Sequence, residues 1–586
     1  MKRTIALIPA TRFRGIGTVV LAVSQVCAFL SSDPLKGQSE CFGAVRENGS
    51  QTEKRVPNQP DRNGDSNNAP QSAQSLADLQ ARVNAIISQP KYRLAEWGVE
   101  VMSLDTGKLL VEQNACKYLV PASNAKLFTA ALALDKLGAG HRIETSVYVT
   151  KQPDAHGSVK GDLIVIGHGD PEFSCGENGK SQSNTLPALV SLLQSKGIHQ
   201  IKGDLIGDES YFNWPPFGAG WGWEDLQWSY GAEVSALTIN ENSVELIVKP
   251  SAKAGMLCQT AIEPSNSLVT VVNRATTSPA SGPRWISVYR PIGENTIYVS
   301  GRLPMGDAGY QGHVAVHRPA NLFIELLRKS MAAGGIKVSG RERVLDWNDR
   351  EASPLDLSNL VLVGSLKSRT IAEIVKETLK RSQNLYAQLL LLQVGALPPG
   401  LPPIGTTSSE NGGAPKPEAY GAGPGTGAPA NTQAPGDQLP PSTEDLGVRA
   451  MDSFLKQFSP CDDDIILEEG SGLSRRDLVT AAGIVGLLSW MNRQQLANVF
   501  RDSLPIAGGD GTLQNRMKDT TAAGNVRAKT GTLKFVTALS GYATTAAGEH
   551  VAFSLLLNNY NRGDNGPATN DIDAVLAAVV AFTGHS

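Results

Sequence analysis

The chain has 586 residues, a formal net charge of −3 and a pI of about 6.3. A chain of this length is too long for one hydrophobic core, so we expect two or three domains. The near-neutral charge and the lack of a long basic run argue against nucleic-acid binding. The eight histidines are scattered and the six cysteines are widely spaced, so we expect no metal and no other cofactor. Cysteine pairing and oligomeric state stay open.

The first 30 residues are typical of an export signal, because basic residues including Lys2 and Arg3 precede an apolar run that ends near Leu30. We therefore expect a protein of the periplasm or cell envelope. The apolar run is nearly long enough to span a membrane, so an uncleaved anchor with peripheral membrane association is the alternative. Residues 31–75 are polar and rich in Pro and Gly, which predicts a disordered linker.

The first ordered segment is expected to be a helix followed by a β-hairpin. Apolar residues at helical spacing predict the helix over 76–87. Alternating residues on both sides of the turn at Asp105 predict strands over 99–103 and 108–112.

The next stretch combines a helix start with two reactive side chains. Pro121 is favoured at helix starts, and the almost wholly apolar run over 127–134 predicts a buried helix that ends near Gly138. Ser123 and Lys126 are three residues apart, so they lie on one helix face. A serine needs an adjacent base to act as a nucleophile, and a desolvated lysine can be that base.

Residues 145–355 show mainly strand patterns and predict a β-rich region. Four tryptophans within 214–228 predict the core of a small insert, with a ligand-binding surface as the alternative. Strands are expected at 144–150, 162–167, 243–248, 268–273, 284–289 and 295–300, followed by a helix at 322–333.

Helical periodicity returns from about residue 361, with Ile371 and Ile374 in one stripe. Residues 395–444 are dense in Pro, Gly, Ala, Thr and Ser, which predicts a disordered insertion. Further helices are expected at 385–393, 446–458, from 479, and at 572–582, and strands at 525–533, 536–544 and 551–557.

Three short motifs follow one another along the chain: Ser123-x-x-Lys126, Ser382-Gln-Asn384 and Lys529-Thr-Gly531. In this order, at a helix start, an interhelical loop and a strand, they match the signature of penicillin-binding proteins and serine β-lactamases. From about residue 76 to 586 the chain resembles the class C low-molecular-mass penicillin-binding proteins, which are D-alanyl-D-alanine carboxypeptidases/endopeptidases of peptidase family S13. Supporting stretches lie at 169–171, 203–208, 221–225, 237–244, 382–387, 470–475 and 510–513.

This resemblance implies a multi-domain α/β protein. A β-lactamase/transpeptidase-like catalytic domain, an antiparallel sheet flanked by helices, would comprise 76–144 and 356–586. Residues 145–355 would form a large β-rich insertion of two domains, the smaller one nested at about 170–240. The long separation of Ser123 and Ser382 agrees with an insertion.

The resemblance also implies roles in acyl transfer. Ser123 would attack a peptide carbonyl and Lys126 would take its proton. Backbone N–H groups of Ser123 and Thr532 would stabilise the oxyanion. Ser382 would relay a proton to the leaving amine, and Asn384 would hold the substrate amide.

Substrate recognition is expected along the strand that carries the third motif. Lys529 would receive the terminal carboxylate together with Thr530 and Thr532, and a peptide would lie along the strand past Gly531.

A side-chain pocket for the stem peptide is implied at four further positions. These are Asp225, Tyr230, Arg475 and Lys534. Tyr230 stands where phenylalanine is familiar and Lys534 where glutamine is familiar, so the residue that the pocket accepts stays open.

We therefore expect a penicillin-sensitive serine D-alanyl-D-alanine carboxypeptidase/endopeptidase that acts on peptidoglycan stem peptides and crosslinks through an acyl-enzyme on Ser123. β-Lactam antibiotics would be covalent inhibitors. The alternatives are a serine β-lactamase or esterase of the same fold, or a non-catalytic envelope protein that binds peptidoglycan. A β-lactamase also needs a residue that activates the deacylating water, and none can be assigned.

Overall fold

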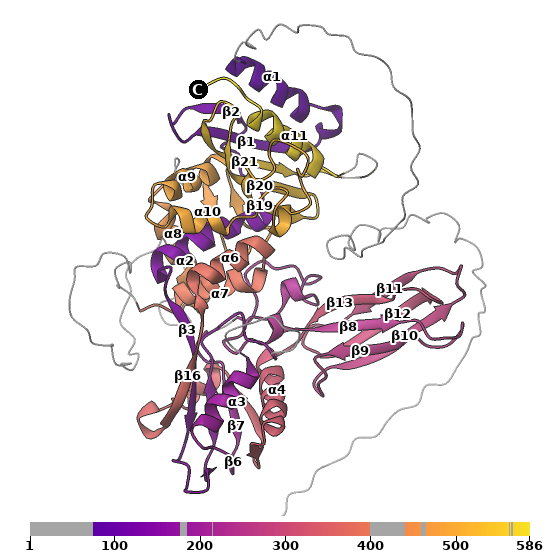
Figure 1. The fold of residues 1–586 in the computed structure, drawn as a ribbon, viewed down its shortest axis with the longest axis vertical. Helices are drawn as coiled ribbons and strands as arrows, with labels where there is room; N and C mark the ends of the chain where they lie inside the picture. Colours follow the sequence, from indigo (N-terminus) through magenta and orange to yellow (C-terminus); the bar gives the residue numbers. More distant parts are fainter. Residues whose placement is uncertain are drawn as a thin grey trace, which may run out of the picture. The chain divides into compact units, whose positions relative to one another are not determined.

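The computed structural model describes residues 74–175, 185–213, 215–398, 440–458, 464–561, 563 and 567–586 (Figure 1). The predicted export signal over 1–30, nearly all of the predicted linker over 31–75 and most of the predicted insertion over 395–444 lie outside these residues. None of the helices in the described ranges is long and apolar enough to cross a membrane.

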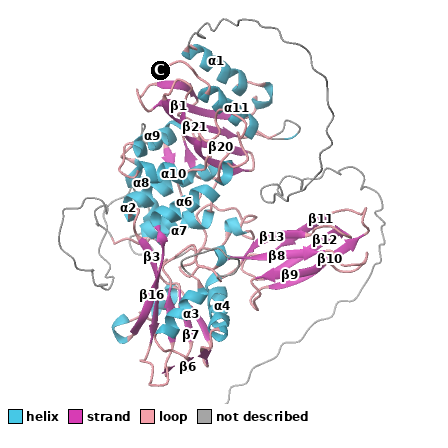
Figure 2. Cartoon of the chain, in the orientation of Figure 1, coloured by secondary structure: helices cyan, strands magenta, loops and turns pink. Residues whose placement is uncertain are grey.

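An antiparallel sheet organises the parts of the chain before and after the insertion (Figure 2). Its five described strands follow the order β19, β20, β21, β1 and β2, so the first hairpin completes a sheet built by the end of the chain. The strands are β1 (Glu96–Ser103), β2 (Leu109–Gln113), β19 (Arg527–Leu533), β20 (Val536–Thr544) and β21 (His550–Asn558).

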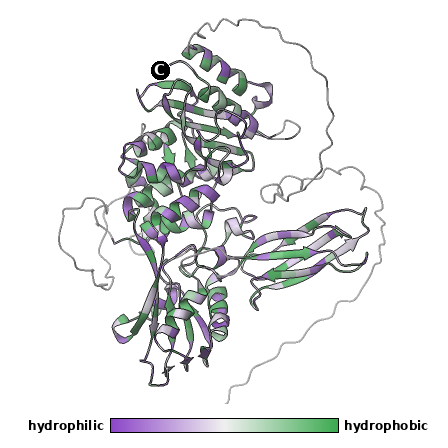
Figure 3. Cartoon of the chain, viewed as in Figure 1, coloured by the Kyte–Doolittle hydropathy of each residue, from purple (hydrophilic) through white to green (hydrophobic). Residues whose placement is uncertain are grey.

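Alternation along β21 assigns the two faces of this sheet. Phe553 and Leu555 join one hydrophobic core, and Ala552 and Leu556 join another. Hydrophobic residues, drawn green in Figure 3, run along these strands and the adjacent helices. The first core includes α1 (Leu76–Ile87) and α11 (Thr569–Val580); the second includes α2 (Lys126–Leu137), α6 (Ile371–Arg381), α7 (Asn384–Gly395), α8 (Thr443–Leu455), α9 (Ala481–Asn492), α10 (Ala497–Ser503), β17 (Ile465–Ile466) and β18 (Leu478–Val479).

The insertion contains a second sheet with the order β15, β7, β5, β3 and β16 in the described chain. β3 follows α2 and β16 precedes α6, and these two strands are antiparallel neighbours. The chain therefore enters and leaves the insertion on adjacent strands. The elements are β3 (Arg142–Val149), β4 (Ser158–Val159), β5 (Leu163–Ile166), α3 (Leu186–Ser195), β6 (Gln200–Ile201), β7 (Leu205–Asp208), α4 (Pro319–Ala333), β14 (Lys337–Val338), β15 (Glu342–Leu345), α5 (Trp347–Ala352) and β16 (Val361–Thr370).

Two smaller sheets follow β7 in the chain. One has the order β13, β8, β9 and the other the order β10, β12, β11 among the described strands. Apolar side chains of both sheets, including Leu246 and Val299, share one core. The strands are β8 (Ser243–Lys249), β9 (Gln259–Glu263), β10 (Thr270–Ser278), β11 (Trp285–Tyr289), β12 (Thr296–Pro304) and β13 (Tyr310–Ala315).

The insertion differs from the sequence expectation in two places. The small separate sheets span 243–315, not 170–240, because β7 in the expected range pairs in parallel with β5 of the larger sheet. The connection between β5 and β7 includes α3, the crossover that a parallel pair requires. Residues 361–370, expected to begin a helical segment, form β16; the helical stripe starts immediately afterwards at Ile371.

The tryptophan cluster serves more than one purpose. Trp221 packs against the core around α2, and Trp228 packs against the core of the insertion. Trp223 is 69% exposed. Trp228 therefore fits the expected core of an insert, whereas Trp221 packs against the core around α2 and Trp223 is exposed; Trp214 lies outside the described residues.

Candidate active site

Ser123 lies in a short turn that leads into a fully buried part of helix α2. Ala122–Ala125 form one 3-10 turn, and the α-helix itself begins at Lys126. Residues 126–134 are all buried, as the unbroken apolar run predicted. Ser123 is therefore held on a rigid element at the edge of the helical core.

Lys126 is completely buried, and its ammonium reaches three acceptors. Nζ lies 3.0 Å from the Ser123 Oγ and 2.6 Å from the Asn384 Oδ1, and it also donates to the Ser471 carbonyl. Burial lowers the pKa of Lys126 to about 7, although the negative charges of Glu469 and Asp477 raise it. A substantial share of the amine is neutral near pH 7, so it can accept the Ser123 proton.

Ser382 and Asn384 lie where helix α6 gives way to helix α7. Ser382 has a left-handed backbone, with φ 62° and ψ 39°, and is followed by the first residues of α7. Its hydroxyl accepts a hydrogen bond from the Lys529 Nζ at 2.8 Å. The Asn384 Nδ2 donates to the Tyr230 carbonyl at 2.8 Å, so Asn384 connects Lys126 to the insertion.

Lys529 lies on strand β19 and is fully buried. Its Nζ donates to the Ser382 Oγ and to the Thr530 carbonyl at 2.7 Å. Burial and the nearby charge of Lys126 hold the pKa of Lys529 well below its ordinary value. The Thr530 hydroxyl donates to the Thr512 hydroxyl at 2.8 Å. The hydrogen bond between Lys529 and Ser382 thus joins the third motif to the second.

Gly531 allows strand β19 to approach the Ser123 turn closely. A Cβ at this position would lie 2.6 Å from the Pro121 carbonyl oxygen and 3.2 Å from the Ala122 Cβ. Any larger residue would therefore push the strand and the turn apart. The following residue, Thr532, is exposed on β19.

Strand β19 forms an edge of its sheet. It pairs with β20 on one side. On the other side Ala528 donates to the Pro505 carbonyl, and Arg527 forms a single bridge with Ile506. From residue 529 to 533 no other described strand pairs with this side, so a peptide can add there as an extra strand.

The four predicted pocket residues fall into two linked pairs. The Tyr230 hydroxyl donates to the Asp225 Oδ1 at 3.1 Å, and an Arg475 NH2 donates to the Lys534 carbonyl at 2.8 Å. Burial raises the pKa of Asp225, and the positive charge of Arg475 partly opposes this rise. The Arg475 guanidinium is therefore close enough to Asp225 to interact with it electrostatically. The Lys534 ammonium lies 5.3 Å from the centre of the Phe535 ring, so the main chain of Lys534, rather than its amine, contacts Arg475.

The sequence did not identify Glu469 or the Ser471 carbonyl as parts of the site. The buried Glu469 carboxylate accepts backbone N–H bonds from Ser471 (2.6 Å), Gly472, Leu473 (2.9 Å) and Ser474. It thereby fixes the loop whose Ser471 carbonyl contacts Lys126. In the sequence, Glu469 can be noticed as a carboxylate directly before a Gly-Ser-Gly turn. The role of a backbone carbonyl such as that of Ser471 cannot be recognised from residue types.

A lysine-paired serine, a Ser-x-Asn loop and a Lys-Thr-Gly edge strand on this sheet define a serine acyl-transfer enzyme of the penicillin-binding and β-lactamase class. The profile of the D-Ala-D-Ala carboxypeptidase 3 (S13) family matches residues 79–404 and 433–579. The chain belongs to this family.

Individual relatives agree with this assignment. The chain is 31% identical over 530 residues to a D-alanyl-D-alanine carboxypeptidase of Actinomadura sp. (strain R39), covering 88% of this chain and 86% of the relative. It is 24% identical over 470 residues to the D-alanyl-D-alanine carboxypeptidase DacB of Haemophilus influenzae, covering 80% and 86%. The crystal structure of penicillin binding protein 4 (dacB) from H. influenzae aligns with a TM-score of 0.67 at 23% identity, covering 86% of this chain and 97% of that one.

These findings confirm the fold class, the family and the enzyme class that the sequence predicted. The protein is a multi-domain α/β D-alanyl-D-alanine carboxypeptidase, and the β-lactamase alternative is not favoured.

Proposed function

We propose that Ser123 is the acylated nucleophile of a penicillin-sensitive carboxypeptidase/endopeptidase that cleaves peptidoglycan stem peptides and their crosslinks. The observation that carries this proposal is the buried Lys126 Nζ, 3.0 Å from the Ser123 Oγ, with a pKa of about 7. An amine in this state is a base matched to neutral pH, beside a hydroxyl that is otherwise a weak nucleophile.

Acylation begins when the Ser123 Oγ attacks the carbonyl carbon between the last two residues of the stem peptide. The Oγ–C bond forms as the hydroxyl proton passes to neutral Lys126 Nζ. The backbone N–H groups of Ser123 and Thr532 stabilise the oxyanion. The C–N bond then breaks, and the proton taken up by Lys126 passes through the Ser382 hydroxyl to the leaving amine, which returns Lys126 to its neutral form. The hydrogen bond between Lys529 and Ser382 supports this relay.

Hydrolysis completes the cycle, because water attacks the acyl-enzyme and regenerates the Ser123 hydroxyl. When the leaving amine belongs to a terminal D-alanine the reaction is that of a carboxypeptidase. When it belongs to the side chain of a neighbouring stem peptide the reaction is that of an endopeptidase.

The substrate lies in an extended conformation along β19 between residues 529 and 533. Lys529, Thr530 and Thr532 receive the terminal carboxylate, and Asn384 holds a substrate amide. The unpaired side of β19 supports this geometry. The side chain of the third stem-peptide residue enters the pocket of Asp225, Tyr230, Arg475 and Lys534, which offers both a carboxylate and cations.

β-Lactams would acylate the same serine, as the name penicillin binding protein of the H. influenzae structure suggests. A substrate of this kind places the protein outside the cytoplasmic membrane, in the periplasm or cell envelope. The signal-like sequence over 1–30 supports export.

Covalent labelling tests the proposal. A fluorescent penicillin should label the purified protein, and Ser123→Ala should abolish labelling, whereas Ser191→Ala, an exposed serine on α3, should label normally. D-Alanine release from a pentapeptide, nitrocefin turnover and digestion of crosslinked muropeptides then separate carboxypeptidase, β-lactamase and endopeptidase action. Absence of label on the wild-type protein would refute the proposal.

A further inference from the structure

The loop formed by Asn240, Glu241 and Asn242 belongs to the insertion yet contacts the catalytic motif that contains Ser382. All three residues have left-handed backbones, with φ of 48°, 55° and 55°. Non-glycine residues adopt this conformation rarely and at a cost in free energy, so a run of three must be held by surrounding contacts. Such strain at a domain junction indicates a functional constraint.

Side-chain contacts on both sides hold this loop. The Asn242 Oδ1 accepts from the Ile239 N–H at 3.0 Å, and its Nδ2 donates to the Glu233 carbonyl at 2.7 Å. The Asn240 Oδ1 accepts from the Cys175 N–H at 3.1 Å. Asn242 is completely buried. The position of Glu241 is therefore fixed by the insertion.

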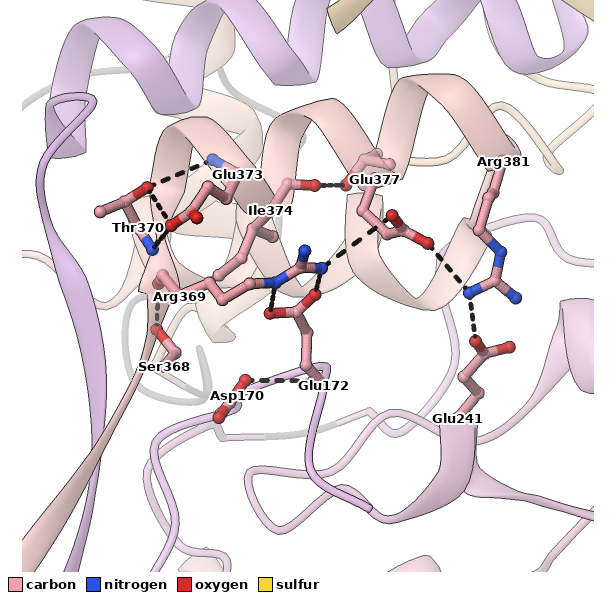
Figure 4. A network of polar contacts seen from close by, with 11 residues as sticks. Asp170, Glu172, Glu241, Ser368, Arg369, Thr370, Glu373, Ile374, Glu377 and Arg381 are labelled. Carbon is pink, nitrogen blue, oxygen red and sulfur yellow. Dashed lines mark hydrogen bonds and ion pairs between the residues drawn. The ribbon is translucent and has the colours of Figure 1, made fainter. Parts of the chain in front are cut away.

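The Glu241 carboxylate contacts both residues that flank Ser382. One oxygen lies 2.9 Å from an Arg381 NH1, and the other accepts from the Gln383 Nε2 at 2.5 Å. Figure 4 shows the Arg381 contact at the end of α6. Ser382, itself left-handed, is thus fixed between two side chains that share one carboxylate.

The end of strand β16, just before α6, carries a second ion pair. The Arg369 Nε donates to the Glu172 Oε2 at 2.6 Å, and Glu172 is buried. Glu377 lies between the two ends, 4.0 Å from Arg369 and 3.1 Å from Arg381 (Figure 4). Glu377 therefore links α6 to Arg369 at the end of β16, and Glu241 is the contact from the insertion next to Ser382.

We propose that Glu241 is a positioning residue for Ser382, through Arg381 and Gln383, and that the insertion thereby forms part of the catalytic apparatus. This inference rests on the proposed function, in which Ser382 passes a proton to the leaving amine. The Arg381 side chain is 44% exposed, so its ion pair contributes little to stability. The expected effect is on the placement of the Ser382 hydroxyl, to which proton transfer is sensitive.

The test compares two leaving groups. A peptide substrate needs a proton on its leaving amine, whereas a thioester analogue expels a thiolate that needs none. Glu241→Ala should lower kcat for the peptide about tenfold while changing thioester hydrolysis less than about twofold. The KM for both substrates should stay within about twofold, because the contacts of Lys529 with substrate are retained.

Glu377→Gln is the matched control. Glu377 binds the same Arg381 at 3.1 Å with nearly the same exposure, 28% against 29% for Glu241, but within the described residues it forms no hydrogen bond with Gln383. It should behave like the wild-type enzyme on both substrates. Glu241→Gln, which keeps the size of the side chain, provides a second variant should Glu241→Ala fold poorly. It should also lower kcat for the peptide more than for the thioester, but by less than Glu241→Ala does.

The outcomes are distinguishable. Equal losses on peptide and thioester, or no loss on either, would overturn the role of Glu241 while leaving Ser123 labelling intact. A wild-type protein that neither labels with penicillin nor hydrolyses either substrate would overturn the proposed function itself.

Discussion

The pKa of about 7 for Lys126 makes acylation dependent on pH in a defined direction. Only the neutral amine can take the Ser123 proton. For a group of this pKa the neutral fraction rises from about 9% at pH 6 to about 91% at pH 8. The second-order rate of acylation by a fluorescent penicillin should therefore rise about tenfold over this range and then level off.

Glu469→Gln should shift this profile. The Glu469 charge raises the pKa of Lys126, so its removal should lower that pKa and move the rising limb to more acidic pH. The amide oxygen can keep the bonds that Gly472, Leu473 and Ser474 donate to Oε1, whereas the bond from the Ser471 N–H to Oε2 is lost.

Stopped-flow or quenched labelling between pH 5.5 and 9, at constant ionic strength, measures both profiles. Burial also holds the pKa of Lys529 well below its ordinary value, so loss of its charge should appear separately, as a KM for carboxylate substrates that rises with increasing pH. A labelling rate that is flat from pH 6 to 8, or that rises towards acid, would refute the assignment of Lys126 as the base.

Two further substitutions test the geometry. Gly531→Ala should reduce penicillin labelling at least about a hundredfold, because the added Cβ would lie 2.6 Å from the Pro121 carbonyl oxygen and would separate β19 from the Ser123 turn; normal labelling of a folded variant would contradict this. Asp225→Asn should raise the KM for a peptide whose third residue carries a side-chain amine about tenfold, through loss of a charge-assisted contact, and leave the labelling rate unchanged; an equal KM for both proteins would remove Asp225 from the pocket.

Local patterns were sufficient to predict the elements around the site. The apolar run over 127–134 corresponds to the buried part of α2, and the alternation at 536–544 corresponds to β20. In each of these segments the pattern of apolar residues depends only on which sides of that helix or strand are buried, so the element can be recognised from the sequence. The three motifs, hundreds of residues apart, meet through the hydrogen bonds of Lys126 with Asn384 and of Lys529 with Ser382.

The insertion was harder to predict because its boundaries depend on long-range pairing. β7 has no local feature that assigns it to the sheet of β5, and β16 leads directly into the helical stripe of α6. The contacts of Glu241 also join segments far apart in the chain. Glu469 acts on Lys126 through backbone groups, which carry no residue-specific pattern. Such relationships appear only once the chain is folded.

The open edge of β19 also has a consequence for the behaviour of the protein in solution. An unpaired strand can template the addition of a strand from another molecule, and this makes exposed edges prone to aggregation. Here the exposed length is short, since Pro505 and Ile506 occupy the first part of the strand. Lys534 follows at the far end and adds a charge of the kind that discourages edge-to-edge association. Under the proposed function, the same edge would admit a short extended peptide while excluding a longer β-strand.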